Sequence, residues 1–266
     1  MTQEQRLDYL LQHLRGESAS SYRWPNAADP DGKRSLLRAI MNVRPPLPLD
    51  ESVLSVQDGY LRRRAREKGI IAAEKLPRSP ADSRLTLWQG DITRLSIDAI
   101  VNAANSKMLG CFVPLHNCID NCIHTFAGMQ LRLECHRHME ALRRKFGPDY
   151  EQPTAVPLLT GAYNLPAAKV IHIVGPISGG RLTSSLEQDL AACYLRILEL
   201  CAAEGLRSLA FCCISTGVFG FPDSRAAVIA VRTVRNWLDS HAGAVDLVVF
   251  NVFKDRDREL YAEELK

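Results

Sequence analysis

Two cysteines and a histidine lie close together in the segment NAANSKMLGCFVPLHNCIDNCIH, which spans residues 102–124. They are Cys111, His116 and Cys118, and the acid Asp120 follows two positions later. Zn²⁺ takes thiolate and imidazole ligands in tetrahedral geometry, and three protein ligands with one open position are typical of a catalytic zinc. Two thiolates also cancel the charge of the ion, which makes such a site easier to bury. The spacing therefore predicts a zinc site in this loop.

Cysteine and histidine also serve as ordinary packing residues. Cysteine is often a small buried apolar side chain, and we prefer that interpretation for Cys135, Cys193, Cys201, Cys212 and Cys213. Cys122 lies four residues after Cys118, on the same face if a helix has begun, so a fourth ligand remains open. A nucleobase deaminase needs H-x-E and P-C-x-x-C, and neither surrounds Cys111 or His116, so we reject that class of zinc enzyme.

The composition is that of an ordinary globular protein, with 266 residues, 46% hydrophobic and 24% charged. A net charge of +3 is too small to indicate a nucleic-acid partner, and runs such as RRRAREK (62–68) are typical of solvated helix faces. The sequence carries neither an apolar stretch long enough to span a bilayer nor a hydrophobic signal-peptide core. We therefore expect a cytoplasmic protein without a membrane partner, whose cysteines are reduced thiols.

The first eighty residues differ from the rest in their pattern. Helical spacing is shared by two apolar sets, Leu7, Leu10, Leu11 and Leu14, and Leu36, Leu37, Ile40 and Met41. Prolines end the second of these helices, and Asp50 is expected to cap a third that runs to about residue 76. The segment LPRSPADS (76–83) reads as a linker. We expect a helical N-terminal extension, residues 1–80, packed on a core domain of residues 84–266.

From Arg84 onward, strand-like and helix-like segments alternate. The strand candidates are LTLWQGDI, AIVNAAN, KVIHIVG, SLAFCCIS and VDLVVFNV. Amphipathic helices are expected over residues 184–205 and 223–241, with Gly205 at the end of the first, and a charged helix should close the chain. Alternation of this kind indicates a layered α/β domain with helices on both faces of a mostly parallel sheet.

Three polar or glycine-bearing segments follow predicted strands, namely GDIT (90–93), NAAN (102–105) and STGVFGFP (215–222). Ligands bind at the carboxyl ends of the strands in open parallel sheets, so all three segments should converge on one cleft. The glycines of the last segment permit positive φ and close backbone approach, so amides there could hold a diphosphate. Each segment also has a structural alternative: a tight turn for the glycine loop, a cap for Asp91, and loop fixation for the asparagines.

Five pieces of the sequence stand in the order found in one family: GDIT, DAIVNAANSKMLG, IDNCIH, TGAYNLPAAKVIHIVGP and CISTGVFGFP. Over roughly residues 84–255 the chain resembles the macrodomain family, and within it the MacroD-type branch of ADP-ribosyl hydrolases. The resemblance implies a three-layer α/β/α sandwich with a mixed, mostly parallel sheet. Where MacroD-type proteins have a run of glycines, this chain has CFVPLHNC. That loop, together with the N-terminal extension, resembles the zinc-containing microbial subgroup.

The resemblance also implies roles for individual residues. Asp91 would hold the adenine with Ile92 beside it, and Asn105 would contact the distal ribose. Asp120 stands where MacroD-type enzymes carry an acid near that ribose. The diphosphate-binding loop would consist of Ser215, Thr216, Gly217, Val218, Phe219, Gly220 and Phe221.

Together these features predict a zinc-dependent hydrolase that removes mono-ADP-ribose from modified protein side chains, with Asp or Glu esters as the expected linkage. Asp120 is the first choice for activating or positioning water and Asn105 for fixing the ribose, although an acid at position 120 also suits a helix N-terminus. Two alternatives remain open: a non-catalytic ADP-ribose reader with a structural zinc, and a hydrolase of free O-acetyl-ADP-ribose. The microbial subgroup further suggests a sirtuin-type ADP-ribosyltransferase and a lipoyl-carrier protein as partners.

Overall fold

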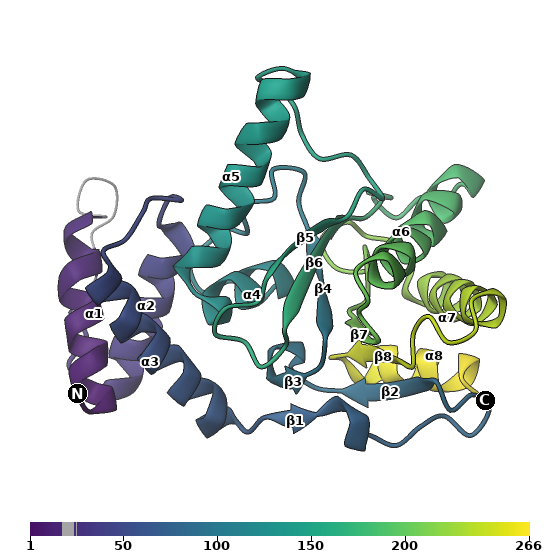
Figure 1. The fold of residues 1–266 in the computed structure, drawn as a ribbon, viewed down its shortest axis with the longest axis horizontal. Helices are drawn as coiled ribbons and strands as arrows, with labels where there is room; N and C mark the ends of the chain where they lie inside the picture. The colour runs from purple at the N-terminus through teal and green to yellow at the C-terminus, as the bar shows by residue number, and fades with distance from the viewer. Residues whose placement is uncertain (18–23, 25) are drawn as a thin grey trace. The chain divides into compact units, whose positions relative to one another are not determined.

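The computed structural model describes residues 1–17, 24 and 26–266 (Figure 1). Contacts within the chain form two compact units. The first, here called the helical unit, comprises Met1–Gly69, Met108–Tyr150 and Ala162–Leu165. The second, the sheet unit, comprises Ile70–Lys107, Glu151–Gly161 and Pro166–Lys266. The two units are defined by contacts and each contains several segments of the chain. They therefore do not test the predicted domain boundary at residues 80–84, which stays a prediction.

The helical unit is built from the helices α1 (Gln3–Glu17), α2 (Pro30–Val43), α3 (Glu51–Lys68), α4 (Ile119–Ala127) and α5 (Met129–Phe146). α1 packs against α2 and α3, both of these contact α4, and α4 contacts α5. The two apolar sets predicted from helical spacing are buried together in one cluster with Val53, Tyr60, Leu61 and Met129. The first two helices of the extension are therefore confirmed. No helix in the described part of the chain is both long and apolar enough to cross a membrane.

The predicted end of the third helix is wrong. α3 ends at Lys68 rather than near residue 76, because Gly69 takes a left-handed φ of 83° that stops the helix. Two β-branched residues follow, and strand β1 (Ile71–Ala72) pairs with β3 (Leu95–Ser96) in the sheet unit. Asp50 does occupy the N-cap position of α3, but its side chain makes no capping hydrogen bond.

A six-stranded sheet forms the core of the sheet unit, in the order β2-β8-β7-β4-β6-β5. Its strands are β2 (Leu85–Gln89), β4 (Ala99–Ala104), β5 (Leu158–Gly161), β6 (Lys169–Val174), β7 (Ser208–Phe211) and β8 (Leu247–Val252). All neighbouring strands are parallel except β5, which runs antiparallel to β6. Every predicted strand is present, and the predicted α/β class with a mixed, mostly parallel sheet is confirmed.

Three helices of the sheet unit accompany these strands, α6 (Ser184–Ala203), α7 (Asp223–Ser240) and α8 (Asp255–Glu264) (Figure 1). α7 packs against α6 and α8, and α8 contacts β2 and β8. Gly205 follows α6 with a φ of 66°, as its predicted place at the helix end requires. Two single 3-10 turns, η1 (Ala73–Lys75) and η2 (Ile92–Arg94), complete the elements of this unit.

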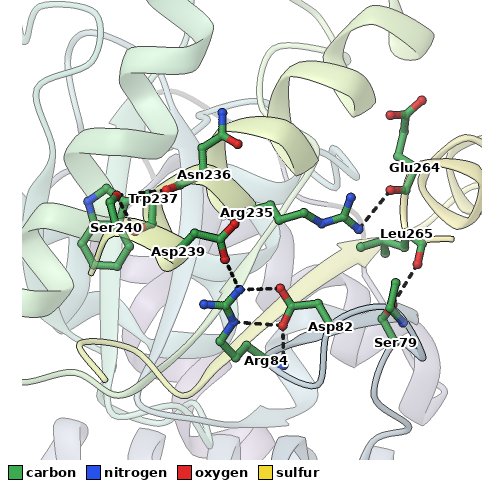
Figure 2. A network of polar contacts seen from close by, with 11 residues as sticks. Ser79, Asp82, Arg84, Arg235, Asn236, Trp237, Asp239, Ser240, Glu264 and Leu265 are labelled. Atoms are coloured by element: carbon green, nitrogen blue, oxygen red, sulfur yellow. Dashed lines mark hydrogen bonds and ion pairs between the residues drawn. The ribbon is translucent and has the colours of Figure 1, made fainter. Parts of the chain in front are cut away.

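The predicted linker 76–83 is held to the sheet unit by a polar network (Figure 2). Arg84 donates to Asp82 through Nε (2.9 Å) and Nη2 (2.7 Å), and Nη2 also donates to Asp239 of α7 at 2.5 Å. The Ser79 hydroxyl donates to the carbonyl oxygen of Leu265 at 2.8 Å. The linker is therefore an ordered segment whose hydrogen bonds connect the start of β2 to α7 and to the end of the C-terminal helix.

Asp82→Asn is expected to lower the free energy of unfolding by about 1–2 kcal/mol at neutral pH. The side-chain hydrogen bonds from Arg84 hold the pKa of Asp82 below its ordinary value, and burial only partly opposes them. A carboxylate with a depressed folded pKa stabilises the protein above its unfolded pKa of about 4, and this contribution is lost as the pH falls through the folded pKa. Urea denaturation across this range should therefore show the difference between wild type and variant shrinking below about pH 4. A difference that stays constant would mean that packing, not charge, is responsible.

Candidate functional site

The three predicted metal donors come together in the loop that precedes α4. The Sγ atoms of Cys111 and Cys118 and a ring nitrogen of His116 all lie within 4.8 Å of one another. The Cys111 Sγ and His116 Nδ1 atoms are 3.5 Å apart. Tetrahedral zinc with Zn–S of about 2.3 Å and Zn–N of about 2.0 Å separates neighbouring donors by roughly 3.5–3.8 Å, so the donor set fits the ion. All three residues are half-buried, as a site with access to ligand requires.

Cys118 is also the N-cap of α4, and its sulfur accepts a hydrogen bond from the Asn121 amide at 3.4 Å. Burial is the main cause that raises the pKa of this thiol to about 12; the Asn121 amide opposes it, and Cys111 and Asp120 add to it. A ligating thiol is deprotonated outright by its metal, and the positive end of the helix favours the thiolate. Without a metal the Cys118 sulfur is therefore a neutral thiol near neutral pH, and a bound ion would be needed to make it a thiolate.

Cys122, which was left open as a fourth ligand, does not join this group among the residues that the structure describes. It lies one turn further along α4, and its sulfur is 3.7 Å from Nη2 of Arg38. All eight cysteines belong to the described residues, and none of them forms a disulfide. The donor set is thus one of three protein ligands, the number expected when a fourth position serves a substrate or water.

Asp120 occupies the first turn of α4, two residues after Cys118, and is only 5% exposed. Its Oδ1 atom lies 3.5 Å from Nε2 of the buried His124, one helical turn later. Burial lowers the pKa of Arg132 to about 10, and the charge of Asp120 is the main influence opposing that shift. Asp120 therefore lies among buried cationic and thiol groups, two residues from the candidate metal donor Cys118. It also has the helix N-terminal position that favours an acid, which is the structural alternative for this residue.

In the sheet unit, the predicted ligand-binding segments follow the carboxyl ends of three parallel strands; β4 and β7 are neighbours, and β8 lies between β7 and β2. Asp91 follows β2, Asn105 follows β4, and residues 215–221 follow β7. Asp91 caps η2: its Oδ1 atom accepts hydrogen bonds from the Thr93 amide (3.0 Å) and hydroxyl (2.5 Å). Asn105 is half-buried and its Oδ1 atom accepts from the Lys107 amide at 3.1 Å. The structural alternatives for both residues are thus realised, and their ligand roles stay predictions.

Ile92, expected beside the adenine, is 1% exposed, so its side chain belongs to the core. The turn that carries it is held by Asn251 of β8, whose Nδ2 donates to the carbonyl oxygens of Trp88 (3.3 Å) and Gly90 (2.9 Å). Sequence reasoning missed Asn251, although its signal was visible as one polar residue in the apolar run VVFNV. A buried amide in such a run indicates that a neighbouring loop needs its hydrogen bonds.

The loop of residues 215–221 has its backbone arranged to hold an anion. Ser215 and Gly220 have left-handed φ values of 66° and 67°, and the Phe221 amide closes the loop on the Ser215 carbonyl oxygen at 3.0 Å. The amides of Gly217, Val218 and Phe219 have no hydrogen-bond acceptor within the described residues. Consecutive amides in such a turn form a concave site for phosphate oxygens.

A second loop, which sequence reasoning did not single out, braces the first. The amides of Ser178 and Gly180 donate to the carbonyl oxygens of Phe219 (3.0 Å) and Gly220 (3.2 Å). The Ser178 hydroxyl also donates to the Gly220 carbonyl oxygen at 2.6 Å. The signal was the glycine pair of GPISGG directly after a buried strand. These hydrogen bonds fix the peptide groups of Phe219 and Gly220, and thereby the orientation of the neighbouring loop amides.

Comparison with known proteins agrees with this arrangement. The family described as Macro domain matches residues 101–230. A Treponema medium protein named protein-ADP-ribose hydrolase is 45% identical over 265 residues, which is 98% of each chain. The chain belongs to the macrodomain family. The resemblance seen in the sequence is thereby confirmed at the level of the family and the fold, while the zinc and the MacroD-type branch stay predictions.

Two further proteins are similar to this macrodomain. A Fusarium oxysporum protein named probable bifunctional ADP-ribose hydrolase/ADP-ribosyltransferase is 41% identical over 250 residues, covering 88% of this chain and 41% of its own. The structure of a Trypanosoma brucei macrodomain in complex with ADP-ribose has a TM-score of 0.61 and 30% identity, covering 91% of this chain and 97% of that one. The match to the Treponema medium protein covers 98% of this chain and therefore extends over its N-terminal helices.

Proposed function

We propose that this macrodomain is an enzyme that hydrolyses the bond between ADP-ribose and a modified protein side chain, with Asp or Glu esters as substrates. One observation carries the proposal: three metal donors gather at the start of α4, and the buried Asp120 lies in the first turn of the same helix. The name of the Treponema medium relative supports the reaction class. The ADP-ribose complex of the Trypanosoma brucei macrodomain supports the ligand.

In this proposal the sheet unit supplies the ADP-ribose contacts. Asp91 accepts from the adenine and Ile92 lines the turn beside it, Asn105 binds the distal ribose, and Phe219 packs against that ribose. The backbone amides of the loop formed by Ser215, Thr216, Gly217, Val218, Phe219, Gly220 and Phe221 donate to the diphosphate. The acceptor-free amides of this loop and the half-buried place of Asn105 support these roles.

Cys111, His116 and Cys118 would hold a Zn²⁺ ion, which supplies a Lewis acid for the negative charge that develops during ester hydrolysis. Asp120 takes up a proton from the attacking water and returns it to the departing group, so that one water is added across the broken bond. The low exposure of Asp120 supports this role, because a buried carboxylate is shielded from bulk solvent and can exchange its proton with a bound water.

Partners and location follow from the same proposal. The Fusarium relative carries hydrolase and ADP-ribosyltransferase names on one chain, which supports a transferase as the source of the modified substrate. A sirtuin-type transferase and a lipoyl-carrier protein as target rest on the resemblance alone. A cytoplasmic location accords with cysteines that form no disulfide in the described chain.

The test combines metal content of the purified protein with ADP-ribose release from an Asp/Glu-modified protein and from O-acetyl-ADP-ribose. About one zinc per chain, with release lost on chelation and restored by Zn²⁺, is the expected result. Stoichiometric zinc and ADP-ribose binding without release from either substrate would make the protein a reader. Faster release from O-acetyl-ADP-ribose than from the modified protein would favour the small-molecule hydrolase. Full activity after chelation would contradict the role given to the metal.

A further inference from the structure

An arginine of the N-terminal extension contacts the loop that carries the candidate metal donors. Arg38, on α2, donates from Nη2 to the carbonyl oxygen of His116 at 2.7 Å. The same nitrogen lies 3.2 Å from Oδ1 of Asn117 and 3.2 Å from Oδ1 of Asn121. Its contact with the Cys122 sulfur at 3.7 Å completes its environment. The guanidinium thus contacts the candidate donor residue His116, and also Asn117 before α4 and Asn121 in its first turn.

One turn further along α2, Asn42 binds the same loop. It is 1% exposed, its Oδ1 atom accepts from the Leu115 amide at 2.9 Å, and its Nδ2 donates to the Thr125 hydroxyl at 2.7 Å. Leu115 has a left-handed φ of 57°, a conformation that is strained for a residue with a side chain. The loop keeps this conformation next to His116 because the buried Asn42 binds its amide.

Asn121 forms hydrogen bonds with residues at the other end of the loop. Its Nδ2 donates to the carbonyl oxygens of Cys111 (3.3 Å) and Val113 (3.0 Å), and its backbone amide donates to the Cys118 sulfur. Its Oδ1 atom in turn faces Arg38. Each of the three donor residues is therefore held by a hydrogen bond from Arg38 or from the asparagine that Arg38 contacts.

We propose that Arg38 and Asn42 are positioning residues for the metal donors, so that the N-terminal extension is part of the metal site. This inference rests on the proposed metal site. A loop left to itself must be ordered when the ion binds, and that cost weakens binding. Because α2 holds the loop before the ion arrives, the donors meet it at the required spacing. Partners that orient metal ligands are typically worth about 10–100-fold in metal affinity.

The experiment measures Zn²⁺ affinity by competition with a chromophoric chelator, and the visible absorption spectrum of the Co²⁺-substituted protein. Arg38→Met keeps the apolar stem and removes the donors, so affinity should fall by about 10–100-fold, and the Co²⁺ spectrum should change. Arg38→Lys should recover part of the affinity because an ammonium still donates to a carbonyl. Arg34→Met is the matched control: Arg34 lies one turn earlier on α2 and pairs with Asp31 of that helix at 2.9 Å. Its affinity should stay within about twofold.

The outcomes separate this inference from the proposed function. A wild type that binds Zn²⁺ tightly, with Arg38→Met unchanged in affinity and spectrum, overturns the inference and leaves the metal site intact. A wild type that binds no Zn²⁺ overturns both. If Arg38→Met fails to fold, as judged by circular dichroism, Arg38→Gln and Asn42→Ser take its place. Equal weakening by Arg34→Met would show a general effect of α2 stability and would also overturn it.

Discussion

Cys118→Ser is expected to remove zinc from the macrodomain and to lower ADP-ribose release by about 10²–10³-fold. Serine is among the best N-cap residues, so its hydroxyl still accepts from the Asn121 amide and α4 keeps its start. What is lost is one thiolate of the donor set, since a serine hydroxyl is a poor ligand for zinc. Metal content, circular dichroism and release rate, measured on the same preparation, separate metal loss from unfolding.

Cys122→Ser is the matched control for that substitution. Cys122 lies on the same helix at similar burial, but it stands outside the donor group in the described structure. We expect this variant to keep about one zinc per chain and its hydrolytic rate. Loss of zinc from Cys122→Ser would make Cys122 the fourth ligand that the spacing left open. A zinc-free Cys118→Ser with full activity would contradict the role of the metal.

Asp120→Asn is expected to lower kcat/KM by about 10²–10⁴-fold while zinc content and ADP-ribose affinity stay within about threefold. The amide has the same shape as the carboxylate, so packing around this 5% exposed residue is preserved. It cannot take up a proton, so the activation of water is lost. Kinetics with modified protein and calorimetric titration with ADP-ribose provide the two readouts.

The acid in the first turn of α2 offers a control for the helix-dipole role of Asp120. Asp31→Asn removes an exposed carboxylate from the same kind of position, and its effect is expected to be a small loss of stability, about 0.3–1 kcal/mol, without loss of activity. If Asp120→Asn behaves in the same way, with most of its activity kept, Asp120 serves the helix and not the reaction.

Several features of this chain could be read from sequence because they depend on local geometry. Strands β2, β4, β6, β7 and β8 were visible as apolar runs, and helices α6 and α7 as a 3.6-residue periodicity, whereas the short strands β1, β3 and β5 were not predicted. The loop at 215–221 was visible through its glycines, because glycine takes positive φ at little steric cost. The positive φ of Ser215 was not visible in the sequence. The gathering of Cys111, His116 and Cys118 was visible because the three residues lie within eight positions of one loop; that they bind zinc stays a prediction.

Tertiary structure decided the environment of those residues. Arg38 and His116 are 78 positions apart, and nothing local to either predicts that one holds the other. The exclusion of Cys122 from the donor group depends on where the loop of Cys111 turns, not on helical spacing. Contacts between residues far apart in the sequence depend on how many side chains pack together, whereas periodicity and φ preferences act within a few residues.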